Sequence, residues 1–121
     1  MNIFEYYLAK ISKLILENKS KLGLKDLNSV DNINLEVPPE HFNFDLSTNV
    51  SLILAKQFKQ NPNKLAKDIK NLLLEQIDHF EIVDVAGPGF INIKLSKVGF
   101  LFNINNILDK KEIYGSKKSN E

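Results

Sequence analysis

The stretch FEIVDVAGPGFINIKL, Phe80–Leu95, decides the fold because it holds two strand patterns around a tight reversal. FEIVDVA and FINIKL are rich in the β-branched and aromatic residues that favour strands. Between them Gly87, Pro88 and Gly89 form a turn, so the two strands are expected to pair antiparallel. A phosphate-binding loop is excluded, because a strand pattern rather than a helix follows the glycines. We expect this turn to set the direction of the second strand.

The second strand has one apolar face and one mixed face, because successive side chains of a strand point to opposite sides. The apolar face carries Ile91, Ile93 and Leu95. The other face carries Phe90, Asn92 and Lys94. Phe90 could pack at the edge of the core, since isolated surface apolar residues are common. The three side chains could also bind one nucleotide, with the aromatic stacking on a base, the amide reading its edge and the lysine meeting phosphate. The pattern alone leaves both interpretations open.

Outward from this hairpin, apolar residues at helical spacing predict helices at 3–18, 50–59 and 61–77. Several residues of DLSTN (45–49) are helix N-cap types and precede the second helix. Asn61 is expected to cap the third helix, with Pro62 at its first position. Ser96 is expected to cap a last helix that runs to about Lys110, with inward side chains at Val98, Leu101, Ile104 and Leu108. An alternating segment at 33–37 predicts one more strand, ended by two prolines.

These elements predict an α+β fold, in which a small antiparallel β-sheet has about four helices packed mainly on one face. The chain has 121 residues, enough for one domain, which we assign to 1–110, with 111–121 as a linker. The other face of the sheet would be available to a partner. We expect a monomer.

Composition excludes several classes of site. The chain has no cysteine, and His41 and His79 are its only histidines and are far apart, so we expect no metal site. Carboxylates are scattered and no catalytic motif is present, so no catalytic residue is assigned. No apolar run has the length of a membrane span and the N-terminus lacks a signal-peptide pattern, which indicates a cytoplasmic chain without a membrane partner.

Lys64, Lys67 and Lys70 recur every third residue on the third predicted helix. A solvated helix face is the ordinary explanation of such a pattern. A stripe that follows a nucleic-acid backbone is the functional alternative. The net charge of +1 favours neither.

Three segments resemble the N-terminal domain of arginyl-tRNA synthetases: FDLSTNVSLILAKQFKQNPNKLAKDI, VDVAGPGFINIKLS and FLFNINNILDKKEIYG. The resemblance covers roughly residues 36–115, and AGPGFINI (86–93) is its most specific element.

The resemblance implies an RNA-binding domain that contacts the D-loop of arginine-accepting tRNA beside a class I catalytic domain. Phe90 and Asn92 would address an exposed D-loop base, and Lys94, Lys64, Lys67 and Lys70 are candidate contacts to the RNA backbone. The full enzyme, an arginine–tRNA ligase of protein biosynthesis, would use ATP and Mg²⁺. This chain lacks the HIGH-like and KMSKS-like motifs, so it is expected to be an inactive fragment that binds no cofactor itself. The alternative is a non-catalytic protein-interaction or structural module that uses the same sheet face.

The sequence departs from the family at two points. The family usually has Gly-Asp before the second helix, where this chain has Phe44-Asp45. Glycine adopts backbone angles that phenylalanine resists, so the loop needs a conformation open to phenylalanine. All basic residues are lysines, so phosphate contacts would lack the planar, two-pronged geometry of arginine.

Overall fold

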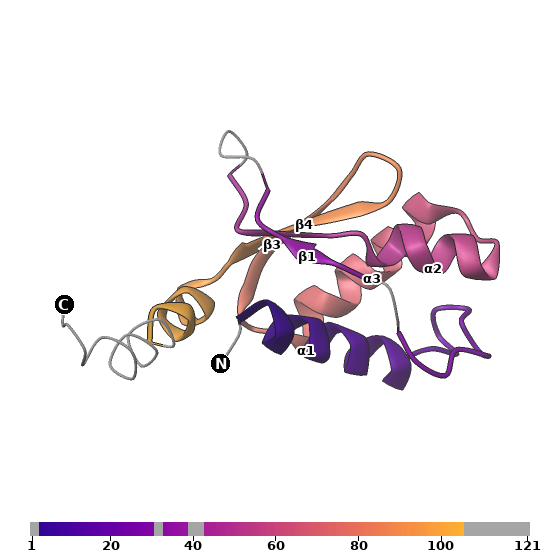
Figure 1. Ribbon diagram of the computed structural model, residues 1–121, viewed down its shortest axis with the longest axis horizontal. Helices are drawn as coiled ribbons and strands as arrows, with labels where there is room; N and C mark the ends of the chain where they lie inside the picture. Colours follow the sequence, from indigo (N-terminus) through magenta and orange to yellow (C-terminus); the bar gives the residue numbers. More distant parts are fainter. Residues whose placement is uncertain (1–2, 31–32, 39–42, 106–121) are drawn as a thin grey trace, which may run out of the picture.

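The computed structural model describes residues 3–30, 33–38 and 43–105 and has an α+β fold (Figure 1). Its elements are, in chain order, α1 (Ile3–Glu17), β1 (Leu35–Glu36), β2 (Leu46–Thr48), α2 (Val50–Phe58), α3 (Pro62–Gln76), β3 (Phe80–Ala86) and β4 (Phe90–Leu95). A further helix begins at Lys97 and continues to residue 105, where the described part of the chain ends. The predicted fold class is confirmed.

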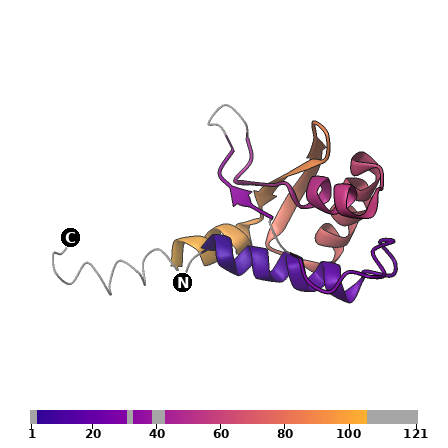
Figure 2. The ribbon, with the colours of Figure 1, turned by 45° about the vertical axis from the view of Figure 1, so that its right-hand side comes forward.

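The described strands form one antiparallel sheet in the order β1-β2-β4-β3, so β4 is central and β3 is at an edge. Helices α1, α2 and α3 gather on one side of this sheet (Figures 1 and 2). Ile91 and Ile93 of β4 face these helices and are fully buried. The opposite side of the sheet, here called the open face, carries exposed side chains of β3 and β4, including Asp84 and Lys94.

The predicted hairpin of β3 and β4 is confirmed, with Ala86 opposite Phe90 across the turn. Gly87 and Gly89 have φ angles of +56° and +113°, which side chains other than glycine's rarely adopt. A Cβ at Gly89 would also lie 2.8 Å from Cβ of Pro62. The glycines therefore allow the turn to reverse and to rest against the first turn of α3.

An irregularity in β3 explains how its apolar residues reach the core. Phe80 pairs with Leu95 and Ile82 with Lys94, so Glu81 is an extra residue in the β3 strand. This extra residue puts Phe80 and Val83, which are three positions apart, on the same buried side. Ile82 lies before this irregularity when counted from the turn, so it shares the open face with Asp84 by strand alternation, and it is 39% exposed.

Residues 45–49 contain several N-cap types, but Leu46–Thr48 form the strand β2. Leu46 and Thr48 pair with β4 and are buried beside it, and the Thr48 Oγ1 also accepts a hydrogen bond from the Val50 backbone N–H (3.2 Å) at the start of α2. The Asn49 side chain does not cap α2; its Oδ1 accepts a hydrogen bond from the Asn34 backbone N–H (2.8 Å). The predicted strand at 33–37 is shorter in the structure, where only Leu35–Glu36 pair.

Helix α3 follows its prediction closely. The Asn61 side chain accepts hydrogen bonds from the backbone N–H groups of Asn63 and Lys64, and Pro62 occupies the first helical position. The predicted apolar stripe is buried throughout, at Leu65, Ile69, Leu72, Leu73 and Ile77. In α1 the buried stripe includes Tyr7 as well as Ile11 and Ile15.

The predicted inward positions of Val98 and Leu101 in the last helix were wrong, because these residues are 53% and 47% exposed, whereas Ile104 is partly buried. Ser96 does cap this helix, accepting a hydrogen bond from the Gly99 backbone N–H (3.2 Å). A Cβ at Gly99 would overlap the His79 carbonyl oxygen, so the absent side chain brings the helix close to the chain before β3. This approach turns Phe102 inward, where its ring packs against Tyr6 (centroids 4.7 Å apart) and His79 (5.0 Å).

Three predictions fall partly or wholly outside the described residues: the end of the last helix near Lys110, the inward position of Leu108, and the linker at 111–121. In the part of the chain that is described, no helix is both long and apolar enough to cross a membrane.

Candidate nucleic-acid interface

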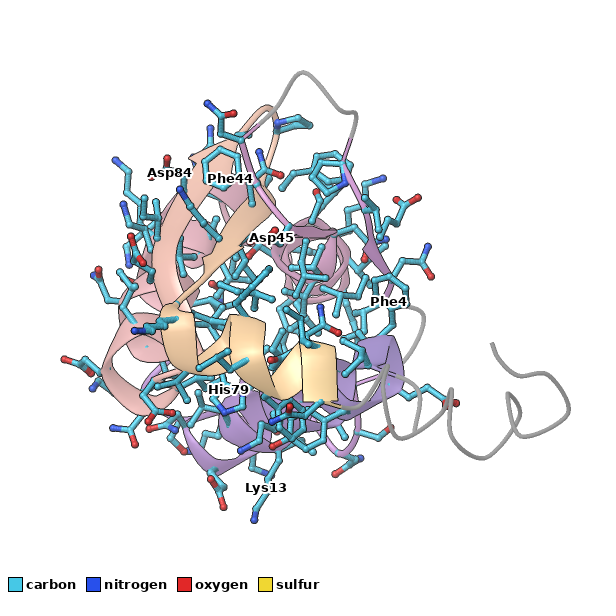
Figure 3. All side chains as sticks on the ribbon, turned by 90° about the vertical axis from the view of Figure 1, so that its left-hand side faces the viewer. Phe4, Lys13, Phe44, Asp45, His79 and Asp84 are labelled. Atoms are coloured by element: carbon cyan, nitrogen blue, oxygen red, sulfur yellow. The ribbon has the colours of Figure 1, made fainter. Side chains whose placement is uncertain are left out.

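The open face contains a hollow of about 560 Å³, which we call the open-face hollow. Its lining combines apolar, amide and charged side chains: Asn43, Phe44, Ile82, Asp84, Ala86, Asn92 and Lys94. These residues come from β3, β4 and the segment before β2, and Figure 3 shows Phe44 and Asp84 near one another on this side. Volumes of roughly 300–1,000 Å³ are usual for small-ligand sites.

Asn92 lies in the middle of the sheet, opposite Ser47 of β2 and Asp84 of β3. It is only 7% exposed, yet its side chain has no hydrogen-bond partner within the described residues. Among the described residues, Ser51 Oγ is the fully buried side-chain polar atom that has no hydrogen-bond partner. The Asn92 amide atoms are not in that class, so they still contact solvent. The Asn92 amide therefore offers a donor and an acceptor to whatever enters the hollow.

Phe90 and Lys94 share the face of Asn92, as strand alternation predicted, but they lie at different ends of it. Phe90 is partly buried beside the Gly87–Gly89 turn and does not line the hollow. Lys94 is exposed and does line it. The three residues thus share one face, and two of them, Asn92 and Lys94, line the hollow.

The three lysines of α3 differ in their surroundings. Lys64 forms an ion pair with Asp68 one turn along the helix (3.1 Å), and both side chains are well exposed. Lys70 reaches around the sheet edge, where its Nζ lies 3.9 Å from Asp84 Oδ1. Lys67 is exposed. Only Lys70 is thus connected to the hollow, through its ion pair with Asp84.

Asp45 joins the segment before β2 to the end of β4. Its carboxylate accepts a hydrogen bond from the Leu95 backbone N–H (2.8 Å), and its own N–H donates to the Ile93 carbonyl oxygen (2.8 Å). The neighbouring Phe44 has no positive φ, so phenylalanine fits the loop without backbone strain. These bonds hold Phe44 at the rim of the hollow.

Sequence reasoning did not assign Phe44, Ile82 or Asp84 to the site. Asp84 could have been found, because a turn of Gly87–Gly89 places the residue three before Gly87 opposite the residue three after Gly89. Ile82 could have been found in the same way, because it pairs with Lys94 in the register that the turn sets. Phe44 was visible only as a departure from the family pattern.

Away from the hollow, two titratable side chains, Tyr7 and His79, contact each other. The Tyr7 hydroxyl is hydrogen-bonded to His79 Nδ1 (2.9 Å) within the ring cluster that includes Phe102. Burial, with a smaller contribution from Tyr6, raises the pKa of Tyr7 to about 12. The described residues contain no group of three or more histidines and carboxylates placed to hold a metal ion.

A family model described as the arginyl tRNA synthetase N-terminal domain matches residues 9–95. The chain is 35% identical over 115 residues to an arginine–tRNA ligase of Pelagibacter ubique, covering 95% of this chain and 20% of the relative. It is 40% identical over 102 residues to the arginine–tRNA ligase of Mesoplasma florum, covering 81% and 18%. The arginine–tRNA ligase of Bacillus pumilus is 35% identical over 115 residues, covering 95% and 21%. The chain thus spans about a fifth of the length of the curated relatives it matches.

Proposed function

Because the chain belongs to the arginyl-tRNA synthetase N-terminal domain family, we propose that it binds the D-loop of arginine-accepting tRNA through its open face. It acts by positioning the tRNA, not by chemistry. Its role is to orient the tRNA so that a class I catalytic domain, in the cytoplasm, can attach arginine using ATP and Mg²⁺. The chain by itself is a monomer without ligase activity.

The single observation that carries this proposal is the unpartnered amide of Asn92. A polar side chain that is nine-tenths buried normally has a hydrogen-bond partner in the protein or in ordered water. Its position in the open-face hollow suits an amide that pairs with the edge of an unstacked base. Single-stranded loops present such edges, and proteins read them by hydrogen bonds combined with stacking.

Phe90 and Lys94 supply the two other contacts of a bound nucleotide. Successive residues on one face of a strand lie about 7 Å apart, so a base near Phe90 or Asn92 has its phosphate within reach of Lys94. Among the α3 lysines, Lys67 and Lys64 remain candidates for more distant backbone contacts. Lys70 is held by Asp84 in the free chain, so it contributes less.

The second candidate function is a protein-interaction module, favoured by the exposed Ile82 on the same face. Salt dependence separates the two functions. Binding to RNA releases counterions, so affinity falls steeply with added salt, whereas apolar docking does not depend on salt in this way.

The test is a titration of the 121-residue chain with an arginine-accepting tRNA transcript at several salt concentrations, comparing Lys94→Gln with Lys64→Gln. Each phosphate contact contributes about 0.7–0.9 to the slope of log affinity against log salt. Lys94→Gln should reduce the slope by roughly this amount, and Lys64→Gln, whose lysine lies outside the hollow, should change it less. Absence of tRNA binding, or a slope near zero, would reject the RNA-binding function.

A further inference from the structure

Phe44 lines the open-face hollow together with Asn92 and Lys94, whereas Phe90 lies outside it at the turn. The Phe44 ring is partly buried, and the Asp45 bonds to Ile93 and Leu95 fix the chain next to it. Among the residues that line the hollow with the Asn92 amide, the aromatic side chain is that of Phe44.

We propose that Phe44 is a stacking residue for the base that Asn92 reads, and that the base enters the open-face hollow. This inference rests on the proposed function and extends it, because it adds an aromatic contact at a position where the resembling family usually has glycine. Phe90 then contacts the nucleotide chain on the turn side of the hollow.

The lining of the hollow suits one unpaired nucleotide. Phe44, Ile82 and Ala86 offer apolar surface for the faces of a base, while Asn92 and Asp84 offer polar groups for its edge. An aromatic platform tolerates any base, since every base has a π-face, so Phe44 adds affinity and leaves base choice to the polar groups.

The charges around the hollow also fit an RNA strand. Asp84 is accompanied by Lys70, whose Nζ lies 3.9 Å from the carboxylate, so the one anionic side chain in the lining is partly neutralised. Lys94 lies on the other strand, opposite Ile82. A phosphate that approaches the hollow beside Lys94 thus meets a cation.

The chain contains no tryptophan, so Phe44→Trp introduces a single indole as a reporter at the hollow. We expect its fluorescence to be quenched saturably by an arginine-accepting tRNA transcript, because a stacked base lies against the ring. A fully paired RNA duplex of similar charge should leave the signal nearly unchanged. Phe100→Trp is the control, since Phe100 is 54% exposed on the last described helix and does not line the hollow.

Affinity provides the second readout. Phe44→Leu keeps apolar volume but removes the π-face, and we expect tRNA binding about fivefold weaker or more, with Phe44→Trp within about twofold of the wild type. Phe100→Leu should bind like the wild type. Thermal unfolding of each variant verifies that it is folded.

The outcomes separate the two levels of the proposal. If the wild-type chain binds tRNA while Phe44→Leu binds equally well and the Phe44→Trp signal does not change, this inference is overturned and the proposed function stands. Equal quenching by the duplex would also overturn the inference. If the wild-type chain does not bind tRNA, the proposed function fails, and this inference fails with it.

Discussion

Asn92 of β4 and Asp84 of β3 face each other across the antiparallel pair on the open face, and both line its hollow. An amide that has no hydrogen-bond partner among the described residues thus lies beside a carboxylate that Lys70 partly neutralises. This pairing is fixed by the Gly87–Gly89 turn, which sets Ala86 opposite Phe90 and hence the register of the hairpin as far as the Ile82–Lys94 pair. The turn therefore determines the composition of the hollow as well as the direction of β4.

The Asp45 carboxylate should contribute measurably to stability. Asp45→Ala removes the acceptor for the backbone N–H of Leu95, a buried residue at the end of β4. We therefore expect the free energy of unfolding to fall by about 1–2 kcal/mol. Asp45→Asn keeps a side-chain oxygen that can accept this bond, so its free energy of unfolding should fall by less than that of Asp45→Ala. Urea denaturation measures the difference, and an alanine variant as stable as the wild type would show that the bond is not needed.

The sign of the stability change caused by Gly99→Ala tests the packing of the last helix. In an open helix this change would stabilise by up to about 1 kcal/mol, through helix propensity. Here the added Cβ meets the His79 carbonyl oxygen, so we expect destabilisation by roughly 1–3 kcal/mol and loss of the Phe102 contacts. Val98→Ala, at an exposed position of the same helix, should stay within about 0.5 kcal/mol of the wild type. A more stable Gly99→Ala variant in urea denaturation would contradict the packing.

Ionisation of Tyr7 should lower the stability of the folded chain at alkaline pH. Its pKa of about 12 in the folded chain exceeds the ordinary value of 10.0, so the folded chain holds the phenolic proton more tightly than the unfolded chain. The resulting stabilisation is complete below pH 10 and is lost as the pH rises through 12. Relative to Tyr7→Phe, wild-type stability should fall by roughly 1 kcal/mol between pH 9 and pH 11. Parallel curves for the two proteins would show that the phenol does not titrate abnormally.

The sequence predicted the hairpin and α3 because local chemistry determines both. The glycine turn, the Asn61 cap and the spacing of Leu65 and Ile69 each act over a few neighbouring residues. Such signals survive in the fold because they agree with the packing around them.

The remaining errors arose where distant contacts overrode local preference. Leu46–Thr48 carry helix-capping residues, but pairing with Ile91 and Ile93 makes them a strand. The last helix has an apolar stripe at Val98 and Leu101, but the helix packs through Gly99 instead, because the missing side chain lets its backbone approach His79 closely. Leu22, Leu24 and Leu27 show no sustained strand alternation or helical spacing in the sequence, yet they are buried in the core.

The candidate site was predicted as a face and not as a hollow. Alternation along β4 identified Phe90, Asn92 and Lys94 as neighbours on one side, which the register bears out. The hollow also needs Phe44 from before β2 and Ile82 beside the extra residue of β3. Ile82 follows from the register of the predicted hairpin, whereas Phe44 does not follow from the pattern of any strand.

Phe90→Ala should weaken tRNA binding if the turn end of β4 contacts the RNA. Loss of one stacked base costs about 1–3 kcal/mol, so we expect a roughly fivefold or greater fall in affinity for an arginine-accepting tRNA transcript. Phe100→Ala, which truncates an exposed aromatic side chain outside the hollow, should bind as the wild type does. A folded Phe90→Ala chain with unchanged affinity would remove Phe90 from the interface.

The most direct measurement of the central claim is a binding cycle between Asn92 and the D-loop. Affinities of the wild-type chain and of Asn92→Ala are measured for one tRNA transcript and for versions with each unpaired D-loop base changed in turn. We predict that one base change weakens wild-type binding by about 1–3 kcal/mol, because the amide pairs with that base edge, and that the same change has almost no effect on Asn92→Ala. If every base change affects the two proteins equally, Asn92 does not read a base and the central claim is wrong.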